Sequence, residues 1–100
     1  MMKSIEILDC YIKQASVEEF LRIEKERIAK MASVSECLGR IVLKGLEVNQ
    51  SIVCTRWQSR EIAFSYRGGT MQRPVLPAFI KNSLDGLQIT WLEEVNFNSV

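Results

Sequence analysis

The chain has 100 residues, of which 47% are hydrophobic and 25% are charged, and its formal net charge is +1. This composition excludes a disordered chain, and the length leaves no room for a second hydrophobic core, so we expect a single domain over residues 1–100. The near-neutral charge gives no argument for a nucleic-acid or membrane partner, and neither is expected. A domain this small buries only about 60–70% of its unfolded surface, which makes pairing with a second copy plausible.

Histidine is absent from the sequence. Its absence excludes catalytic pairs of histidine with serine or cysteine, and removes the commonest metal ligand and the usual haem ligand. The three cysteines, Cys10, Cys37 and Cys54, form no CxxC motif, so free thiols in a reducing compartment are expected. Without a signal-peptide pattern or an apolar run of membrane-spanning length, the interpretation is a cytoplasmic protein. No metal and no cofactor are expected.

The first third of the chain predicts a strand followed by a helix. Residues 4–13 are apolar on both alternating faces, apart from Asp9 on the face that it shares with Tyr11. Ser16 and Glu19 have the spacing of a capping box, which predicts that a helix begins there and ends before residue 39. The residues expected on its buried stripe are Val17, Phe20, Leu21, Ile28 and Met31.

The middle of the chain predicts a hairpin and a second helix. Residues 40–48 and 51–57 are rich in strand-forming side chains, with a turn expected at residues 49–50. Ser59 is expected to cap a short helix over residues 60–67, which the following glycines would end.

The last third is less regular. Residues 68–77 contain two glycines and both prolines, and a helical turn is expected at 78–82. The Asp-Gly pair at 85–86 predicts a turn into a last strand over 87–95, with a loose tail at 96–100.

The predicted order of elements is therefore β-α-β-β-α-β. This order is typical of an α+β ferredoxin-like fold, with a four-stranded antiparallel sheet and both helices on one face. RNA-recognition domains share the order, but residues 51–57 lack the aromatic run on which those domains stack bases. RNA binding is therefore not expected.

Two segments, EEFLRIEKERIAKM and CLGRIVLKGLEVNQSIVCTRWQSREIAF, resemble the first helix and the central hairpin of antibiotic-biosynthesis-monooxygenase-like proteins. In that family a strand tryptophan, a serine two residues later and a helix follow one another, as Trp57, Ser59 and residues 62–64 do here. The resemblance covers residues 4–67, and 87–95 supply the last strand. It implies a homodimer in which two sheets form a dimeric α+β barrel, with a ligand pocket between each sheet and its helices.

Known activities of that family are cofactor-independent oxygenation of aromatic or quinol substrates, haem degradation and isomerisation. Haem-degrading members use a histidine from the region after the second helix, which here holds none, so haem degradation is not expected. Two functions stay open. One is a cofactor-independent monooxygenase or isomerase acting on a small, planar, largely apolar ligand. The other is a non-catalytic homodimer that binds a ligand or serves as a scaffold.

Asp9 is the first candidate for catalysis, as a proton acceptor. A carboxylate among apolar strand residues is costly to bury, so its face is wet, it has a partner such as an arginine, or it serves as a base. Arg67 is the candidate for stabilising a negatively charged oxygen. Core packing of the aromatic groups and solvent exposure of the arginines are the competing interpretations. The residues predicted to contact the ligand are Trp57, Tyr66, Tyr11, Arg56 and Arg73. The segment 68–77 is either a lid or an ordinary connection.

Overall fold

A computed structural model describes residues 3–67 and 82–95 of the chain. The element order confirms the predicted β-α-β-β-α-β arrangement, with one short 3-10 helix, η1, added before the first α-helix. The elements are β1 (Ser4–Ile12), η1 (Gln14–Ser16), α1 (Val17–Met31), β2 (Cys37–Lys44), β3 (Gln50–Trp57), α2 (Arg60–Arg67) and β4 (Leu84–Glu93). No helix in the described ranges is long and apolar enough to cross a membrane.

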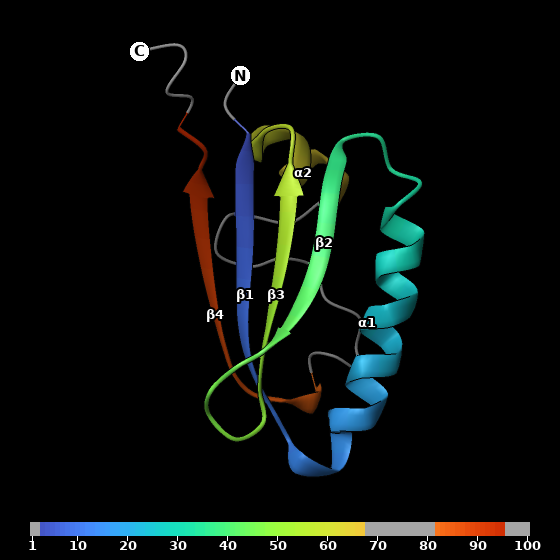
Figure 1. The fold of residues 1–100 in the computed structure, drawn as a ribbon, viewed down its shortest axis with the longest axis vertical. Coiled ribbons are helices and arrows are strands. Elements are labelled where there is room, and N and C mark those ends of the chain that lie inside the picture. The colour runs from blue at the N-terminus through green and yellow to red at the C-terminus, as the bar shows by residue number, and fades with distance from the viewer. Residues whose placement is uncertain (1–2, 68–81, 96–100) are drawn as a thin grey trace.

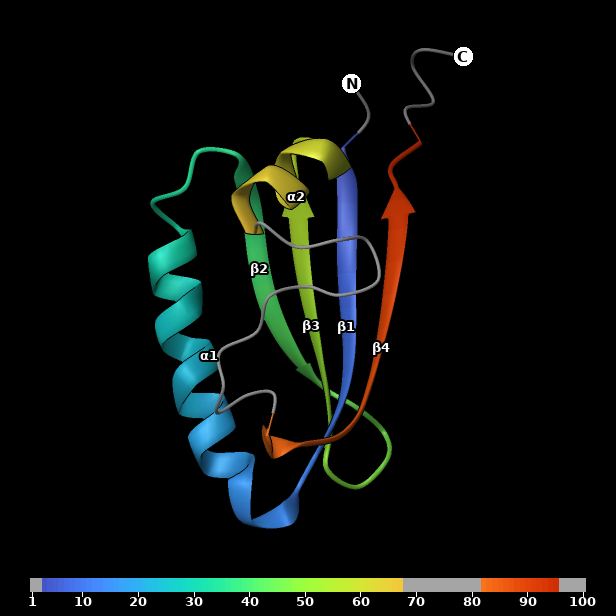
Figure 2. The same cartoon turned by 180° about the vertical axis from the view of Figure 1, so that it is seen from behind.

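The four strands form one sheet in the order β2-β3-β1-β4, and every neighbouring pair is antiparallel. Figure 1 shows β1 and β3 in the middle of the sheet. In the view from behind, α1 and α2 lie in front of the strands, so both helices are on one face of the sheet (Figure 2). We call this the covered face and the opposite one the open face. The architecture is the α+β ferredoxin-like fold.

Among the described residues, the core on the covered face forms two apolar clusters. The first, which we call the Phe20 cluster, packs α1 against the middle of the sheet and comprises Leu8, Cys10, Ile12, Phe20 and Val53. The second, the Trp57 cluster, lies toward α2 and comprises Met31, Trp57 and Ala63. Alternation along β1 and β3 produces both clusters, because every second residue of these strands faces the helices.

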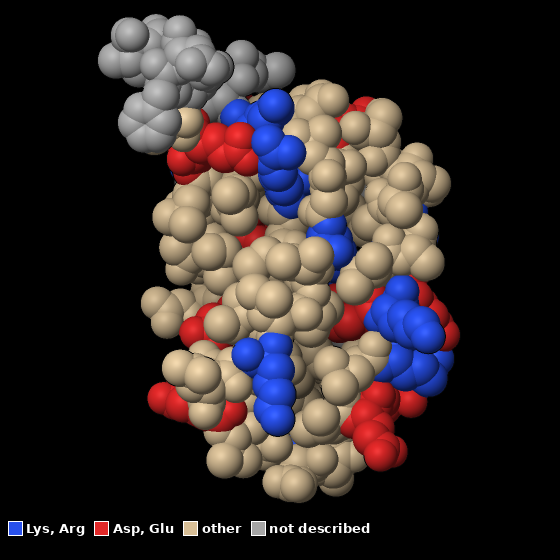
Figure 3. All heavy atoms as spheres, in the orientation of Figure 1, with Lys and Arg blue, Asp and Glu red and all other residues tan. Residues whose placement is uncertain are grey.

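The open face is also apolar, as the sequence predicts. Ile41, Leu43 and Leu92 point away from the helices and are between 46% and 55% exposed. Uncharged atoms occupy most of the middle of this face in the view of Figure 3. An apolar sheet face of this kind is typical of a surface that another layer covers.

Two predicted turns differ from the structure. The second strand ends at Lys44 rather than at residue 48, because residues 45–49 form a longer loop that closes with Asn49 in the left-handed region at φ 61°. The turn predicted at 85–86 is wrong. Asp85 and Gly86 lie inside β4, where the pairing of β4 with β1 shifts register between Tyr11 and Ile12. An irregularity in the strand pairing thus accommodates the Asp-Gly pair.

The capping box predicted at Ser16 is wrong as well. Ser16 directly precedes α1, but its side chain makes no cap hydrogen bond, because η1 already holds its backbone near helical angles (φ −107°, ψ −2°). An N-cap side chain needs an extended backbone to reach back to the helix amides. On the buried stripe, Leu21 is exposed while Glu24 is buried. The predictions for residues 68–77, 96–100 and most of 78–82 concern segments outside the described residues.

The two predicted caps provide a matched pair for testing. The Ser59 hydroxyl accepts a hydrogen bond from the Ile62 amide at 3.2 Å, and Ser59 is buried. We expect Ser59→Ala to lower the free energy of unfolding by about 1 kcal/mol, because it leaves a helix amide without its acceptor. Ser16→Ala is expected to leave it unchanged. Urea unfolding followed by circular dichroism measures both, and equal effects of the two substitutions would contradict this account.

Candidate functional site

Polar side chains separate the two apolar clusters on the covered face. We call this group the polar layer: Glu6 on β1, Glu24 and Arg27 on α1, Arg40 on β2 and Thr55 on β3. Glu6, Glu24 and Thr55 are at most 2% exposed, and Arg40 is 6% exposed. A protein core of this size is normally apolar at such positions, so four ionisable groups here need a physical explanation.

The strand register places three of these residues side by side. Thr55 pairs with Glu6 on one side and with Arg40 on the other. Trp91 of β4 continues the same line, because it pairs with Glu6. One line across the sheet therefore carries a guanidinium, a hydroxyl, a carboxylate and an indole, all facing the helices.

Glu24 connects this line to α1. Arg40 donates through Nη2 to Glu24 Oε2 at 2.8 Å and through Nη1 to Thr55 Oγ1 at 2.9 Å. Arg27 donates to the other Glu24 oxygen at 3.1 Å. Burial and the positive charge of Arg40 both lower the pKa of Arg27. Two carboxylates thus face two guanidiniums, which offsets a desolvation cost of several kcal/mol for each ion.

A pocket of about 360 Å³ opens beside the polar layer, between the end of α1 and the start of β2. Arg40 belongs to both the polar layer and the pocket. Its Nε is buried and makes no hydrogen bond within the described part of the chain. The residues that line the pocket are Ile28, Met31, Ala32, Cys37, Leu38, Gly39 and Arg40. Apolar walls with one cationic donor suit an apolar molecule that carries an acidic or negatively charged oxygen. We call it the Arg40 pocket.

Trp57 is the predicted ligand-contacting residue that lies on the covered face. It is fully buried in the Trp57 cluster, two residues along β3 from Thr55. Trp91 and Phe64 form an edge-to-face pair nearby, with ring centroids 5.1 Å apart. Aromatic groups therefore adjoin the polar layer on the side toward α2.

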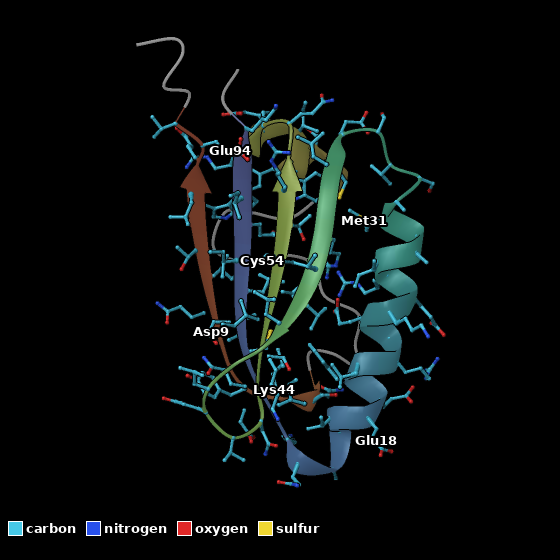
Figure 4. The ribbon with its side chains drawn as sticks, in the orientation of Figure 1. Asp9, Glu18, Met31, Lys44, Cys54 and Glu94 are labelled. Atoms are coloured by element: carbon cyan, nitrogen blue, oxygen red, sulfur yellow. The ribbon has the colours of Figure 1, made fainter. Side chains whose placement is uncertain are left out.

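Asp9, Tyr11 and Arg56 lie on the open face instead, so the structure does not bring them together with Trp57. Asp9 accepts a hydrogen bond from Gln50 Nε2 at 2.9 Å. Tyr11 donates to Glu47, which raises the pKa of the phenol, and Arg56 forms an ion pair with Glu94. Figure 4 shows Asp9 near the end of the sheet where the β2–β3 loop lies. Met31, at the C-terminal end of α1, lies toward the opposite end of the sheet.

The remaining predicted residues, Tyr66, Arg67 and Arg73, have side chains outside the described part of the structure. Their predicted roles stay predictions. Among the described residues, no group of three or more aspartate, glutamate or cysteine side chains is placed to hold a metal ion.

Sequence reasoning missed Glu6, Glu24 and Arg40, although two of them carried a signal. Glu24 stands four residues after Phe20 and four before Ile28, so it lies on the apolar stripe of α1. Glu6 shares its alternating strand face with Leu8. Glu6 and Glu24 are each a charged residue at a position where the sequence pattern predicts a buried apolar side chain, and this pattern identifies them. Arg40 could not be found in this way, because its neighbours depend on the register between β2 and β3.

No protein-family model matches the sequence, and no curated protein matches it. Solved structures of the same fold do match. A putative antibiotic biosynthesis monooxygenase from Nitrosomonas europaea superposes with a TM-score of 0.75 at 8% identity, covering 93% of this chain and 90% of that one. A conserved protein from Methanosarcina mazei gives 0.74 at 14% identity, covering 95% of each chain.

A heme-degrading protein from Mycobacterium tuberculosis is a third structure of this kind. Its TM-score is 0.68 at 18% identity, and the match covers 95% of this chain and 93% of that chain. The predicted resemblance to antibiotic-biosynthesis-monooxygenase-like proteins is thereby confirmed for the fold, which is α+β and ferredoxin-like.

The buried ion pair gives the first test of the polar layer. Arg40→Met leaves Glu24 buried beside Arg27 alone, so we expect the free energy of unfolding to fall by about 3–5 kcal/mol. Replacing both partners, as in R40M/E24M, is expected to recover most of that loss. Arg22→Met breaks only two exposed pairs, with Glu19 and with Glu26, and is expected to change nothing measurable. Equal effects of R40M and R22M in urea unfolding would contradict the assignment.

Cys10 gives a second test, because it lies in the Phe20 cluster next to the polar layer. Burial, followed by the negative charges of Glu24 and Asp9, raises the pKa of its thiol to about 12. In the native protein at pH 8, we expect iodoacetamide to label Cys37 but not Cys10, as read by mass spectrometry.

The same shift has a consequence for stability. The unfolded thiol loses its proton near pH 9, while the folded thiol keeps it up to about pH 12. Stability from this group is therefore complete below pH 9 and declines above it. A Cys10→Ala variant is expected to lose stability less steeply between pH 9 and 11 than the parent. Identical slopes would contradict the raised pKa.

Proposed function

We propose that the chain is a homodimeric domain that binds a small, planar, largely apolar molecule bearing an acidic oxygen. The observation that carries this proposal is Arg40, which is buried in the polar layer and also lines an otherwise largely apolar pocket. Neighbours of this fold include a putative antibiotic biosynthesis monooxygenase and a heme-degrading protein, which supports a ligand site in this architecture.

The pocket supports one chemical class of ligand. Its volume of about 360 Å³ is at the lower end of the range of small-molecule sites, which favours one or two fused rings over a larger molecule. Ile28, Met31 and Leu38 supply apolar walls. Arg40 Nε makes no hydrogen bond within the described residues, but its side chain is buried. We therefore propose that the ligand's hydroxyl, enolate or carboxylate oxygen meets this donor once the pocket widens toward it.

The proposed activity is cofactor-independent oxygenation or isomerisation. Glu6 is our choice of proton acceptor, although it does not line the pocket itself. It lies across Thr55 from Arg40 in the sheet, so the hydroxyl proton of the substrate reaches it through the Thr55 hydroxyl. The electron pair stays on the substrate oxygen, where the Arg40 guanidinium stabilises the charge. The anion then reacts with dioxygen, which is both co-substrate and oxidant. One oxygen atom enters the ring as a carbonyl, and the other leaves as water with the displaced ring hydrogen and the hydroxyl proton. In an isomerisation, the anion is instead protonated at another carbon.

A non-catalytic ligand-binding domain is the second candidate. The observation that favours it is that Glu24 already has two guanidinium partners and Arg40 already holds Glu24 and Thr55. Polar groups that satisfy one another in this way stabilise one arrangement of helix and sheet without chemistry. The presence or absence of turnover distinguishes the two candidates.

The homodimer is proposed from the open face. Its exposed apolar side chains, including Ile41, Leu43 and Leu92, are covered if the open faces of two copies pack together. Asp9 lies on this face, so its predicted role as a proton acceptor, with Arg67, requires a site outside the Arg40 pocket.

Calorimetric titration with 1-naphthol tests the binding proposal, with naphthalene as the matched probe that lacks the hydroxyl. We expect 1-naphthol to bind at least tenfold more tightly than naphthalene. Arg40→Lys keeps the charge but removes the Nε donor and is expected to abolish this preference, while Arg56→Lys on the open face preserves it. Loss of the preference in R56K but not in R40K would contradict the site.

Oxygen uptake with a naphthohydroquinone, corrected for its spontaneous oxidation, tests the activity. Glu6→Gln is expected to abolish enzymatic uptake, while Asp9→Asn leaves it intact. The opposite result would move the base to the open face, and binding without any turnover would establish the second candidate.

A further inference from the structure

The loop between β2 and β3, residues 45–49, leaves the plane of the sheet on its open side. In Figure 1 it passes in front of the strands, and in the view from behind it lies at their back. Leu46 is fully exposed at its tip, and Val48 is 82% exposed. A soluble chain rarely presents two large apolar side chains together on a projecting loop unless they meet a partner.

The loop is held firmly in place. The Gly45 amide donates to the Gln50 carbonyl at 2.9 Å, and the Ile12 amide donates to the Asn49 carbonyl at 2.9 Å. The Gln50 side chain accepts from the Glu47 amide and donates to Asp9.

Two further contacts come from the end of β1 and from η1. Asn49 Nδ2 donates to Gln14 Oε1 at 3.2 Å, and the Tyr11 hydroxyl donates to Glu47. Polar groups thus fix the loop backbone while its apolar side chains face water. A loop fixed in advance loses little conformational freedom when it binds, which favours binding at its tip.

We propose that residues 45–49 form an arm that packs against a second copy of this chain. The inference rests on the proposed homodimer and extends it, because it assigns the loop a part in the interface. Leu43 of β2, whose side chain lies on the open face, lines one surface hollow together with Leu46 and Val48 of the arm.

The area that a stable dimer needs supports the arm. Four strands spaced about 4.8 Å apart, each contributing about eight residues at about 3.4 Å, give the sheet a footprint of about 500 Å². A standard interface buries about 800 Å² on each partner. Side chains stand out of the plane of the sheet, so the accessible surface of the face exceeds this flat footprint. The face and the arm on the same side of the sheet together reach the size that a stable dimer needs.

The arm also gives Asp9 a role. Asp9 holds Gln50, and Gln50 holds Glu47, so the carboxylate acts as a positioning residue for the arm. Asparagine keeps the oxygen acceptor and alanine removes it. Asp9→Ala is therefore expected to weaken dimerisation, whereas Asp9→Asn restores it.

Sedimentation velocity over a concentration series measures the dimer dissociation constant. We expect L46S/V48S to raise it at least tenfold, because two apolar side chains leave the interface. Leu87→Ser, an exposed leucine on the covered face of β4, is the matched control and is expected to leave it unchanged. Asp9→Ala is expected to raise the constant.

The two proposals fail in different ways. If Ile41→Asp separates the dimer while L46S/V48S and Asp9→Ala leave its dissociation constant unchanged, the homodimer stands and the arm is refuted. If the parent chain is monomeric at about 100 μM, the homodimer itself is refuted, and the proposed arm is refuted with it.

Discussion

The buried contact between Glu24 and Arg40 is the constraint on which the rest of the structure depends. It joins α1 to the edge strand β2 at 2.8 Å, with both side chains removed from water. An uncompensated ion at this depth costs several kcal/mol, so the helix can sit on the sheet only where the two groups meet. That single position sets the Phe20 cluster on one side and the Trp57 cluster on the other, and it leaves Arg40 at the base of a pocket.

The two faces of the sheet have separate physical characters. On the covered face, carboxylates and guanidiniums lie in a dry environment, where electrostatic interactions are stronger than in water. On the open face, Asp9 and Tyr11 hold a loop rather than a ligand, and the remaining side chains are largely apolar. We infer that the covered face binds small molecules and that the open face binds a second copy of the chain. Successive side chains of β1 point to opposite faces of the sheet, so neighbouring residues of this strand belong to the two different proposed sites.

Much of the fold was predictable because it depends on local patterns. The cap at Ser59, the helix at Arg60–Arg67 and the order of elements follow from spacing and propensity. The turn at 85–86 was predicted wrongly, because strand pairing with β1 overrides the turn preference of Asp-Gly. The site was harder, since Arg40 meets Glu24 only through tertiary packing. Asp9 drew attention as a lone carboxylate in a strand, while Glu6 in the same strand is the more deeply buried of the two.

The central claim is that the ligand meets Arg40 on the covered face. Nitrogen-15 NMR of the arginine Nε–H groups during a titration with 1-naphthol tests it most directly. The account predicts a saturable shift of the Arg40 signal with no change in that of Arg56, which lies on the open face. A shift of Arg56 and of the neighbouring open-face amides, with Arg40 unaffected, would contradict it.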